Sequence, residues 1–263
     1  MGLLDGKVAL ITGASTGMGR AIAERLAAEG AALGLVARGR EKLEEAAARA
    51  RDLGGPAFSF PGDVSERAFA KRVVDQMVER LGRIDLLVNN AGTNTFHRNL
   101  ADITEADWRR VMDTNITGVF LFTRYVLRPM RRAGRGQIIS ISSTAGIAPN
   151  APSGIAYSAS KSALHSFTTS VNLEERPHGI RACVIAPGET DTPNLDLRPL
   201  PPSAEALAKM LRAEDIANAV LYVASQPEHV SVELLVLTPT VRRNYLADYD
   251  RYVAEGHTDV EPD

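Results

Sequence analysis

Cysteine is nearly absent from this sequence, because Cys183 is the single one among 263 residues. An intrachain disulfide is therefore impossible, and the reducing cytoplasm is the compartment that we expect. Cys183 lies in the short apolar run RACVIAP, which indicates an inert thiol of the core rather than a nucleophile.

Net charge and long apolar runs are also lacking. The formal net charge is −2, so there is no strong basic field to hold nucleic acid or an anionic membrane. No apolar run approaches the roughly 18 residues that cross a bilayer. The N-terminus, MGLLDGKVAL, carries acid and glycine where a signal peptide has its apolar core. We expect a soluble, cytoplasmic protein that binds neither nucleic acid nor membrane.

Metal-ligand spacing is a third absence. The five histidines, at positions 97, 165, 178, 229 and 257, include no H-x-x-x-H pair. We therefore expect no metal site. His97 follows a strand-like run, where it either contacts a substrate or lies on the surface.

Strand-like apolar runs alternate with helical runs along the chain. The expected strands are 7–13, 31–37, 57–63, 84–92, 136–143, 180–188 and 232–240. The expected helices are 18–30, 40–54, 65–82, 104–132, 157–175 and 213–225. Ser65 is the expected N-cap and Gly82 the expected stop of the third helix. A polar segment, DTNITG, interrupts the fourth helix.

This alternation predicts an α/β fold with one doubly wound parallel sheet of about seven strands and helices on both faces. No low-complexity linker divides the chain, so we expect one Rossmann-type domain over 1–240 and a charged tail over 241–263. The Pro-rich segment 194–206 is long enough to form a lid or a substrate-binding loop.

A glycine-rich turn joins the first expected strand to the first helix. It reads TGASTGMG from Thr12 to Gly19, with glycines that permit a tight turn and close approach of a pyrophosphate to a helix N-terminus. The alternative is a glycine-rich turn in an α/β protein that binds no nucleotide.

The end of the second expected strand bears on which nucleotide would bind. NAD-binding proteins usually carry an acid there, whereas NADP-binding proteins supply arginine for the extra phosphate. Here Ala37 stands at the acid's place and Arg38 follows, with Arg40 and Lys42 beyond. These residues favour NADP(H) over NAD(H), although Arg40 and Lys42 also suit a solvated helix start.

The pentapeptide YSASK places Tyr157 and Lys161 four residues apart. On a helix their side chains share a face, so the lysine can lower the pKa of the phenol and make it a usable proton donor and acceptor. By itself the spacing equally fits an ordinary surface pair.

Several motifs in order make the chain resemble the short-chain dehydrogenase/reductase family, over about residues 5–240. They are TGASTGMG (12–19), DV (63–64), NNAG (89–92), Asn115 in DTNITG, ISS (141–143), YSASK (157–161) and PG followed by Thr192. More loosely, APGETDTPN resembles an NADP-preferring bacterial subgroup. The chain departs from the many members that carry a Gly-rich VDGG stretch after the last helix.

The resemblance implies a set of cofactor-binding residues. Asp63 would contact adenine with Val64 beside the ring, Asn89, Ala91 and Gly92 would line the ribose, and Thr192 would meet the nicotinamide carboxamide. Asn90 is expected to be structural. The full expected set is Gly13, Ser15, Thr16, Gly17, Met18, Gly19, Arg38, Asp63, Val64, Asn89, Ala91, Gly92, Tyr157, Lys161, Pro187, Gly188, Thr190 and Thr192.

The resemblance also implies a catalytic set of Asn115, Ser143, Tyr157 and Lys161. Tyr157 would move the proton, Lys161 would lower its pKa and bind ribose, and Asn115 would hold a water. Ser143 would orient the carbonyl, with Thr144 as a weaker candidate because the spacing to Tyr157 is one residue longer than usual. Glu189 either binds a substrate hydroxyl or cation, or caps a turn.

The expected activity is NADP(H)-dependent interconversion of a small ketone or aldehyde with an alcohol, as in a carbonyl reductase or alcohol dehydrogenase. The alternative is a catalytically idle dinucleotide sensor or scaffold. The family's pattern implies a homo-oligomer through the helices over 104–132 and 157–175, and of a dimer and a tetramer we favour the tetramer. The apolar residues considered for that contact are Val111, Val119, Phe120, Ala163, Phe167 and Val171.

Overall fold

A sheet of seven parallel strands organises the protein, in the order β3-β2-β1-β4-β5-β6-β7. The structure is a computed structural model that describes residues 2–193, 195, 202–241 and 254. The strands are β1 (Val8–Thr12), β2 (Ala32–Ala37), β3 (Ala57–Pro61), β4 (Leu86–Asn89), β5 (Gly136–Ile141), β6 (Ile180–Pro187) and β7 (Leu234–Leu237). The order reverses between β1 and β4, and ligands of such sheets bind at that switch point.

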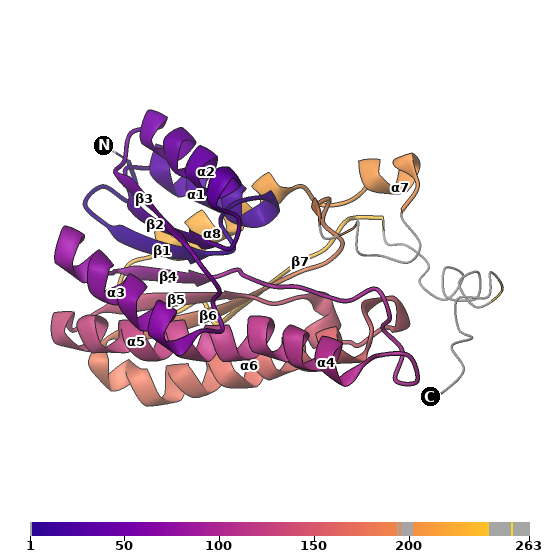
Figure 1. The fold of residues 1–263 in the computed structure, drawn as a ribbon. Helices are drawn as coiled ribbons and strands as arrows, with labels where there is room; N and C mark the ends of the chain where they lie inside the picture. The colour runs from indigo at the N-terminus through magenta and orange to yellow at the C-terminus, as the bar shows by residue number, and fades with distance from the viewer. Residues whose placement is uncertain (1, 194, 196–201, 242–253, 255–263) are drawn as a thin grey trace.

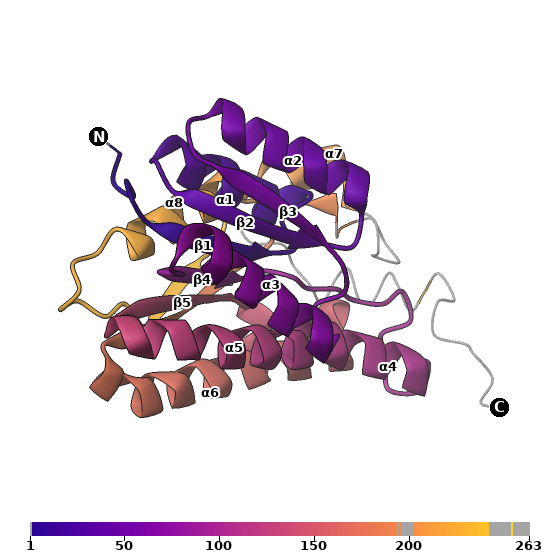
Figure 2. The ribbon, with the colours of Figure 1, turned by 60° about the vertical axis from the view of Figure 1, so that its left-hand side comes forward.

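Helices cover both faces of the sheet (Figures 1 and 2). The helices are α1 (Gly17–Ala28), α2 (Arg40–Asp52), α3 (Arg67–Leu81), α4 (Glu105–Met112), α5 (Gly118–Ala133), α6 (Ile155–Glu175), α7 (Ala204–Ala208) and α8 (Ala213–Ala224). Helices α1, α2 and α8 lie on one face, and α3, α5 and α6 lie on the other. This is the single-domain, three-layer Rossmann-like arrangement that the sequence pattern predicts, and the prediction is confirmed.

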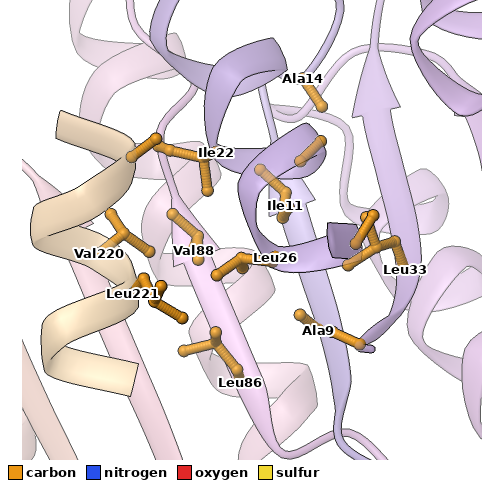
Figure 3. Packing of buried hydrophobic residues seen from close by; sticks show 14 of the residues in the cluster. Ala9, Ile11, Ala14, Ile22, Leu26, Leu33, Leu86, Val88, Val220 and Leu221 are labelled. Atoms are coloured by element: carbon orange, nitrogen blue, oxygen red, sulfur yellow. The ribbon is translucent and has the colours of Figure 1, made fainter. Parts of the chain in front are cut away.

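The apolar core between α1, α8 and the sheet holds α1, and with it the turn between β1 and α1, in place. Ile22 and Leu26 of α1 lie in one apolar cluster with Val88 of β4 and Val220 of α8 (Figure 3). Burial of each such side chain contributes roughly 1.5–3 kcal/mol. Because α1 is anchored along this face, the turn that precedes it is held at the carboxyl edge of the sheet.

The expected strands and helices are all present, with ends that differ by a few residues. The start of α3 is a correction, because its N-cap is Glu66 rather than Ser65. Both the N–H and the hydroxyl of Ser65 donate to Asp63 Oδ1, at 2.8 and 2.7 Å, in a local turn that competes with helix capping. Gly82 ends α3 in the left-handed conformation, as expected.

The expected loop 194–206 also differs from the structure where it is described. Ser203 accepts a hydrogen bond from the N–H of Ala206 and begins the short helix α7. Residues 194 and 196–201 lie outside the described part of the chain, as does the expected tail except for Val241 and Ala254.

The polar interruption of the fourth helix is a π-helix, η1 (Asp113–Thr117), between α4 and α5. The wider i→i+5 turn is a local feature that frequently marks functional sites. Asn115 lies within it and is fully buried. The interruption therefore brings a polar side chain into the interior next to α6, with which η1 makes contact.

The apolar residues considered for a subunit contact differ in exposure, and two of them, Ala163 and Phe167, are half-buried. Val111, Val119 and Val171 are buried within the chain itself, which removes them as contact residues. Phe120 keeps an exposed side chain, and Leu173 on α6 is also exposed. Within the described ranges, no helix combines the length and the apolar character needed to cross a membrane.

Candidate active site

The turn between β1 and α1 forms one wall of a cavity of about 270 Å³. The turn is closed so tightly that side chains do not fit. A Cβ at Gly19 would lie 2.0 Å from the carbonyl oxygen of Gly13. A Cβ at Gly13, which has φ +66°, would lie 2.8 Å from the Cα of Ala91. Bare backbone and the N-terminus of α1 therefore border the cavity, which suits the phosphates of a dinucleotide.

Asn90 fastens this turn to the neighbouring strand. Its Nδ2 donates to the carbonyl oxygens of Thr12 and Gly13, at 3.1 and 3.0 Å. The preceding residue, Asn89, is buried and donates to Thr123 Oγ1 at 3.2 Å. Asn90 therefore has the structural role expected of it, and the Asn89 side chain is engaged inside the core.

The far end of the cavity carries Arg38, directly after β2. Its side chain is exposed, and within the described residues it has neither a hydrogen bond nor an ion pair. Asp63 is the one carboxylate among the described lining residues, and its Oδ1 already accepts hydrogen bonds from Ser65. The cavity mouth thus offers an unpaired guanidinium, a group well suited to a phosphate.

Tyr157 and Lys161 lie one turn apart near the start of α6. The Lys161 Nζ is 5.4 Å from the centre of the Tyr157 ring and donates to the carbonyl oxygen of Ile141 at 2.8 Å. Lys161 is only 4% exposed, and this burial lowers its pKa from 10.5 to about 8. At neutral pH the ammonium form still predominates, next to the phenol.

The two serines after β5 have different surroundings. Ser142 is buried, and its hydroxyl donates to the carbonyl oxygen of Lys161 at 3.0 Å. Ser143 Oγ accepts a hydrogen bond from the N–H of Ala145 at 3.1 Å, which leaves its own proton available to donate. Both serines line a cavity with Tyr157 and Thr144. The Ser142 hydroxyl is already donated to α6, whereas the Ser143 hydroxyl can still donate.

Asn115 supports the same turn of α6. Its Nδ2 donates to the Thr93 carbonyl oxygen and to Ser160 Oγ, both at 3.0 Å. Its Oδ1 accepts from the Thr93 N–H at 2.8 Å, and Ser160 Oγ donates to the carbonyl oxygen of Tyr157 at 2.7 Å. The side-chain amide is thus fully engaged in positioning, and the water-holding role expected of Asn115 stays a prediction.

A second cavity, of about 110 Å³, lies beside Tyr157 and Ser143. Met18 and Thr192 line both cavities, so the two adjoin. Glu189, just after β6, is 8% exposed and lines the second cavity. The site therefore joins the cavity beside the glycine turn to a small chamber that contains a phenol, a serine hydroxyl and a carboxylate.

The sequence profile of the family described as short chain dehydrogenase matches residues 7–199. The chain belongs to the short-chain dehydrogenase family. It is an oxidoreductase, and members of this family bind nicotinamide dinucleotides and act on small molecules.

Relatives of this short-chain dehydrogenase differ in what they bind. A 3-alpha-(or 20-beta)-hydroxysteroid dehydrogenase of Mycobacterium bovis is 38% identical over 230 residues, 88% of this chain and 86% of that one. A metagenomic short-chain oxidoreductase in complex with NADP has TM-score 0.79 and 34% identity, covering 91% of this chain and 100% of that one. An NAD⁺-bound xylitol dehydrogenase has TM-score 0.82 and 29% identity, covering 90% and 99%.

The cavity beside the β1–α1 turn brings together most of the residues expected to bind cofactor. Those that line it are Gly13, Ser15, Thr16, Gly17, Met18, Gly19, Arg38, Asp63, Val64, Ala91, Gly92 and Thr192. The second cavity contains Pro187, Gly188 and Thr190, whose hydroxyl donates to the Gly188 carbonyl oxygen at 3.2 Å. Asn89 and Lys161 line neither of these two cavities.

Sequence reasoning missed several lining residues of this short-chain dehydrogenase. In the cavity beside the β1–α1 turn they are Ala37, Gly39, Gly62, Asn90, Thr93, Thr114 and Pro193. In the second cavity they include Asn94, Arg98, Asn150, Pro152 and Ser153. Thr114 precedes Asn115, which lies in the polar segment that the sequence analysis identified. The missed residues of the second cavity come from loops and a short 3₁₀ turn, which have no periodic pattern. The exposed His97 stacks edge-on against Phe96 and lines neither cavity.

Proposed function

We propose that this short-chain dehydrogenase interconverts a ketone or aldehyde with an alcohol, using NADP(H), with Tyr157 as the acid and base. The observation that carries the proposal is the chamber shared by Tyr157 and Ser143, which adjoins the nucleotide cavity at Met18 and Thr192. A carbonyl in that chamber meets two hydroxyl groups on one side and the cofactor's cavity on the other.

Each catalytic side chain has a role that follows from its surroundings. The nicotinamide supplies or accepts the hydride when the cofactor is bound. Tyr157 donates its phenolic proton to the carbonyl oxygen during reduction, and Ser143 donates a hydrogen bond to the same oxygen. Lys161⁺ favours the phenolate form of Tyr157 and so lowers the free energy of proton transfer. Two N–H groups of Lys161 remain for ribose hydroxyls, since one is donated to Ile141.

The preference for NADP(H) over NAD(H) rests on the end of β2. Ala37 carries no acid that would repel a 2′-phosphate, and the exposed Arg38 lies on the cavity with its guanidinium unpaired among the described residues. A bidentate guanidinium–phosphate contact contributes both energy and orientation. The NADP bound to the metagenomic relative is consistent with this preference. Because the xylitol dehydrogenase binds NAD⁺, the cofactor preference of this chain has to be measured.

The cofactor-binding assignments belong to the same proposal. Asp63 and Val64 would border the adenine, Ala91 and Gly92 the ribose, and Thr192 the nicotinamide amide. Pro187, Gly188 and Thr190 would shape the wall between cofactor and substrate rather than bind phosphate, because they lie on the second cavity. Asn89 would act through the strand it stabilises, because its side chain is buried against Thr123.

We also propose a homo-oligomer, either a dimer or a tetramer, in which the exposed side chains of Phe120 and Leu173 on α5 and α6 contact another subunit. Exposed large apolar side chains on neighbouring helices favour such a contact. Light scattering at micromolar concentration tests it, and a monomeric mass contradicts it.

The activity itself is tested by mixing the enzyme with NADPH and a panel of aldehydes and ketones, while absorbance of the reduced cofactor is followed. We expect turnover of at least one class of carbonyl compound. NADPH binding is measured in parallel by fluorescence titration. Tight binding with no turnover of any compound contradicts the proposal and favours a dinucleotide sensor or scaffold.

A further inference from the structure

We propose a further ligand site, at the edge of the sheet opposite the glycine turn, that binds a small organic carboxylate carrying a hydroxyl group. The site is a cavity of about 250 Å³, here called the amino-edge cavity. It lies at the amino ends of β1, β4, β5 and β6, beside the carboxyl end of α8. None of the described residues that line it lines either cavity of the candidate active site.

One row of side chains across four strands forms the floor of the amino-edge cavity. The parallel pairing places Ala9 beside Leu86, Leu86 beside Gln137, and Gln137 beside Arg181. Side chains in register on neighbouring strands lie on the same face of a sheet. Ala9 and Leu86 belong to the core on the α1 and α8 side (Figure 3). The polar side chains of Gln137 and Arg181 therefore lie on that side too, where α8 ends.

Gln137 supplies a buried acceptor without a partner. The residue is 5% exposed, and its Nε2 donates to the carbonyl oxygen of Val223 on α8 at 3.0 Å. Because a carbonyl oxygen only accepts, this contact fixes which end of the amide is which. The Oε1 atom has no hydrogen-bond partner within the described ranges, yet it is not sealed off from the cavity. Its complement in a ligand is a hydroxyl that can donate.

The charges around the amino-edge cavity favour a monoanion. Its lining includes the cations Lys7, Arg135 and Arg181 and the carboxylates Asp85 and Glu228, which leaves one positive charge in excess. Within the described ranges the Lys7 ammonium has neither a hydrogen bond nor an ion pair. The Arg135 guanidinium lies 3.9 Å from Asp85 and 3.7 Å from Glu228, beyond hydrogen-bond distance, and its buried Nε has no partner. A carboxylate supplies the acceptors that both cations lack.

The other charged groups at this edge already have partners. Arg181 Nη1 donates to the carbonyl oxygens of Pro227, at 2.6 Å, and Val230, so its charge offsets the negative end of α8. Asp85 Oδ2 accepts from the Val8 N–H at 3.0 Å, and its Oδ1 is in an ion pair as well. An incoming anion is therefore bound by Lys7 and Arg135.

Apolar walls favour an organic ligand over an inorganic anion. Leu4, which is 3% exposed, lines the cavity together with Ala31, Leu86, Ala224 and Pro227. The Leu4 N–H donates to the carbonyl oxygen at position 29, at 2.9 Å, so the wall formed by the N-terminal segment is fixed to the end of α1. The carbon atoms of a small organic acid cover these side chains, and phosphate or sulfate does not.

The ligand class is tested with 2-hydroxy-2-methylpropanoate, a tertiary alcohol that has no hydrogen on its hydroxyl-bearing carbon and so cannot be oxidised by hydride transfer. Calorimetric titration compares it with 2-methylpropanoate, which lacks the hydroxyl, with 2-hydroxy-2-methylpropanamide, which lacks the charge, and with inorganic phosphate. We expect its Kd to be lower by at least about fivefold than that of each comparison compound, and saturating NADPH to leave it within about twofold. No binding up to about 10 mM, equal binding of a comparison compound, or displacement by NADPH overturns the proposal.

Two substitutions test the residues that bind the anion. Lys7→Gln and Arg135→Gln each remove one unsatisfied cation, and we expect each to raise the Kd of 2-hydroxy-2-methylpropanoate by at least about fivefold. The matched control is Lys71→Gln on α3, which removes the same charge from an exposed ion pair with Asp75 outside the cavity. We expect the control to stay within about twofold of wild type, and all three variants to keep the wild-type Kd of NADPH, which verifies their fold. An unchanged Kd of the probe in Lys7→Gln or in Arg135→Gln contradicts the assignment.

Discussion

The Nζ of Lys161 lies 5.4 Å from the centre of the Tyr157 ring while it donates a hydrogen bond to the carbonyl oxygen of Ile141. Helix α6 supplies both side chains, and the carboxyl end of β5 supplies the acceptor. The ammonium is thus held between the sheet and the phenol with almost no access to water. The same burial makes the lysine costly to keep charged.

The buried lysine predicts how stability depends on pH. Burial lowers the pKa of Lys161 from 10.5 to about 8. Below about pH 8 both folded and unfolded chains carry the proton, and the folded chain bears the full cost of the buried charge. Between about pH 8 and pH 10.5 only the unfolded chain keeps it, so stability rises with pH.

Lys161→Met removes this pH dependence. Between about pH 7 and pH 9.5, we expect the free energy of unfolding of the wild type to rise by roughly 2 kcal/mol relative to that of the variant. Urea unfolding without cofactor measures it for both proteins at each pH. A difference between the two proteins that stays constant over this range contradicts the lowered pKa.

Alanine is expected to have a different effect at each of the two serines after β5: loss of activity at one and loss of stability at the other. Ser143→Ala removes a donor to the substrate oxygen, and we expect kcat to fall by roughly 100- to 1,000-fold with an unchanged fold. Ser142→Ala removes the bond to the Lys161 carbonyl oxygen, and we expect a loss of about 1 kcal/mol in stability. Retained activity in Ser143→Ala, with loss in Thr144→Ala, would transfer the role to Thr144.

The glycine turn predicts a steric effect at Gly19. Gly19→Ala places a Cβ 2.0 Å from the Gly13 carbonyl oxygen, so the turn has to open. We expect a loss of about 1–3 kcal/mol in stability and weaker NADPH binding. Gly39→Ala is the matched control for stability, because a Cβ there has no neighbour within 4 Å. Equal unfolding curves for the two variants would show that the turn tolerates a side chain.

The parallel sheet and the glycine turn could be predicted from the sequence because both depend on local signals. Strands such as β1, which is buried throughout, read as continuous apolar runs. Gly13 and Gly19 are set by spacing within one turn. The interruption at Asn115 was visible as a polar segment, although its π-helical geometry was not.

The walls of the second cavity could not be predicted, because long-range contacts assemble them. Arg98 and Asn150 lie in separate irregular loops, and the Arg98 side chain joins these loops by donating to the Pro152 carbonyl oxygen. No periodicity marks such residues. The expected Ser65 cap failed for a related reason, since Asp63 accepts the hydrogen bonds of Ser65 before the helix begins.

The cofactor preference is tested at Arg38. Arg38→Asp replaces the exposed guanidinium beside Ala37 with a carboxylate, which repels a 2′-phosphate and accepts from ribose hydroxyls. We expect the Kd of NADPH to rise by at least about tenfold and that of NADH to fall. Fluorescence titration with both cofactors measures the change. An NADPH affinity that barely changes would show that other residues set the preference.

The central claim is that Tyr157 transfers the proton to and from the substrate. Tyr157 is not needed to form the cavity that binds the cofactor. The most direct measurement is turnover by Tyr157→Phe, with NADPH binding measured on the same preparation. We expect the Kd of NADPH to stay within about threefold of wild type and kcat to fall by at least about 100-fold. A Tyr157→Phe variant that binds NADPH and turns over carbonyl compounds within about twofold of wild type would contradict the account.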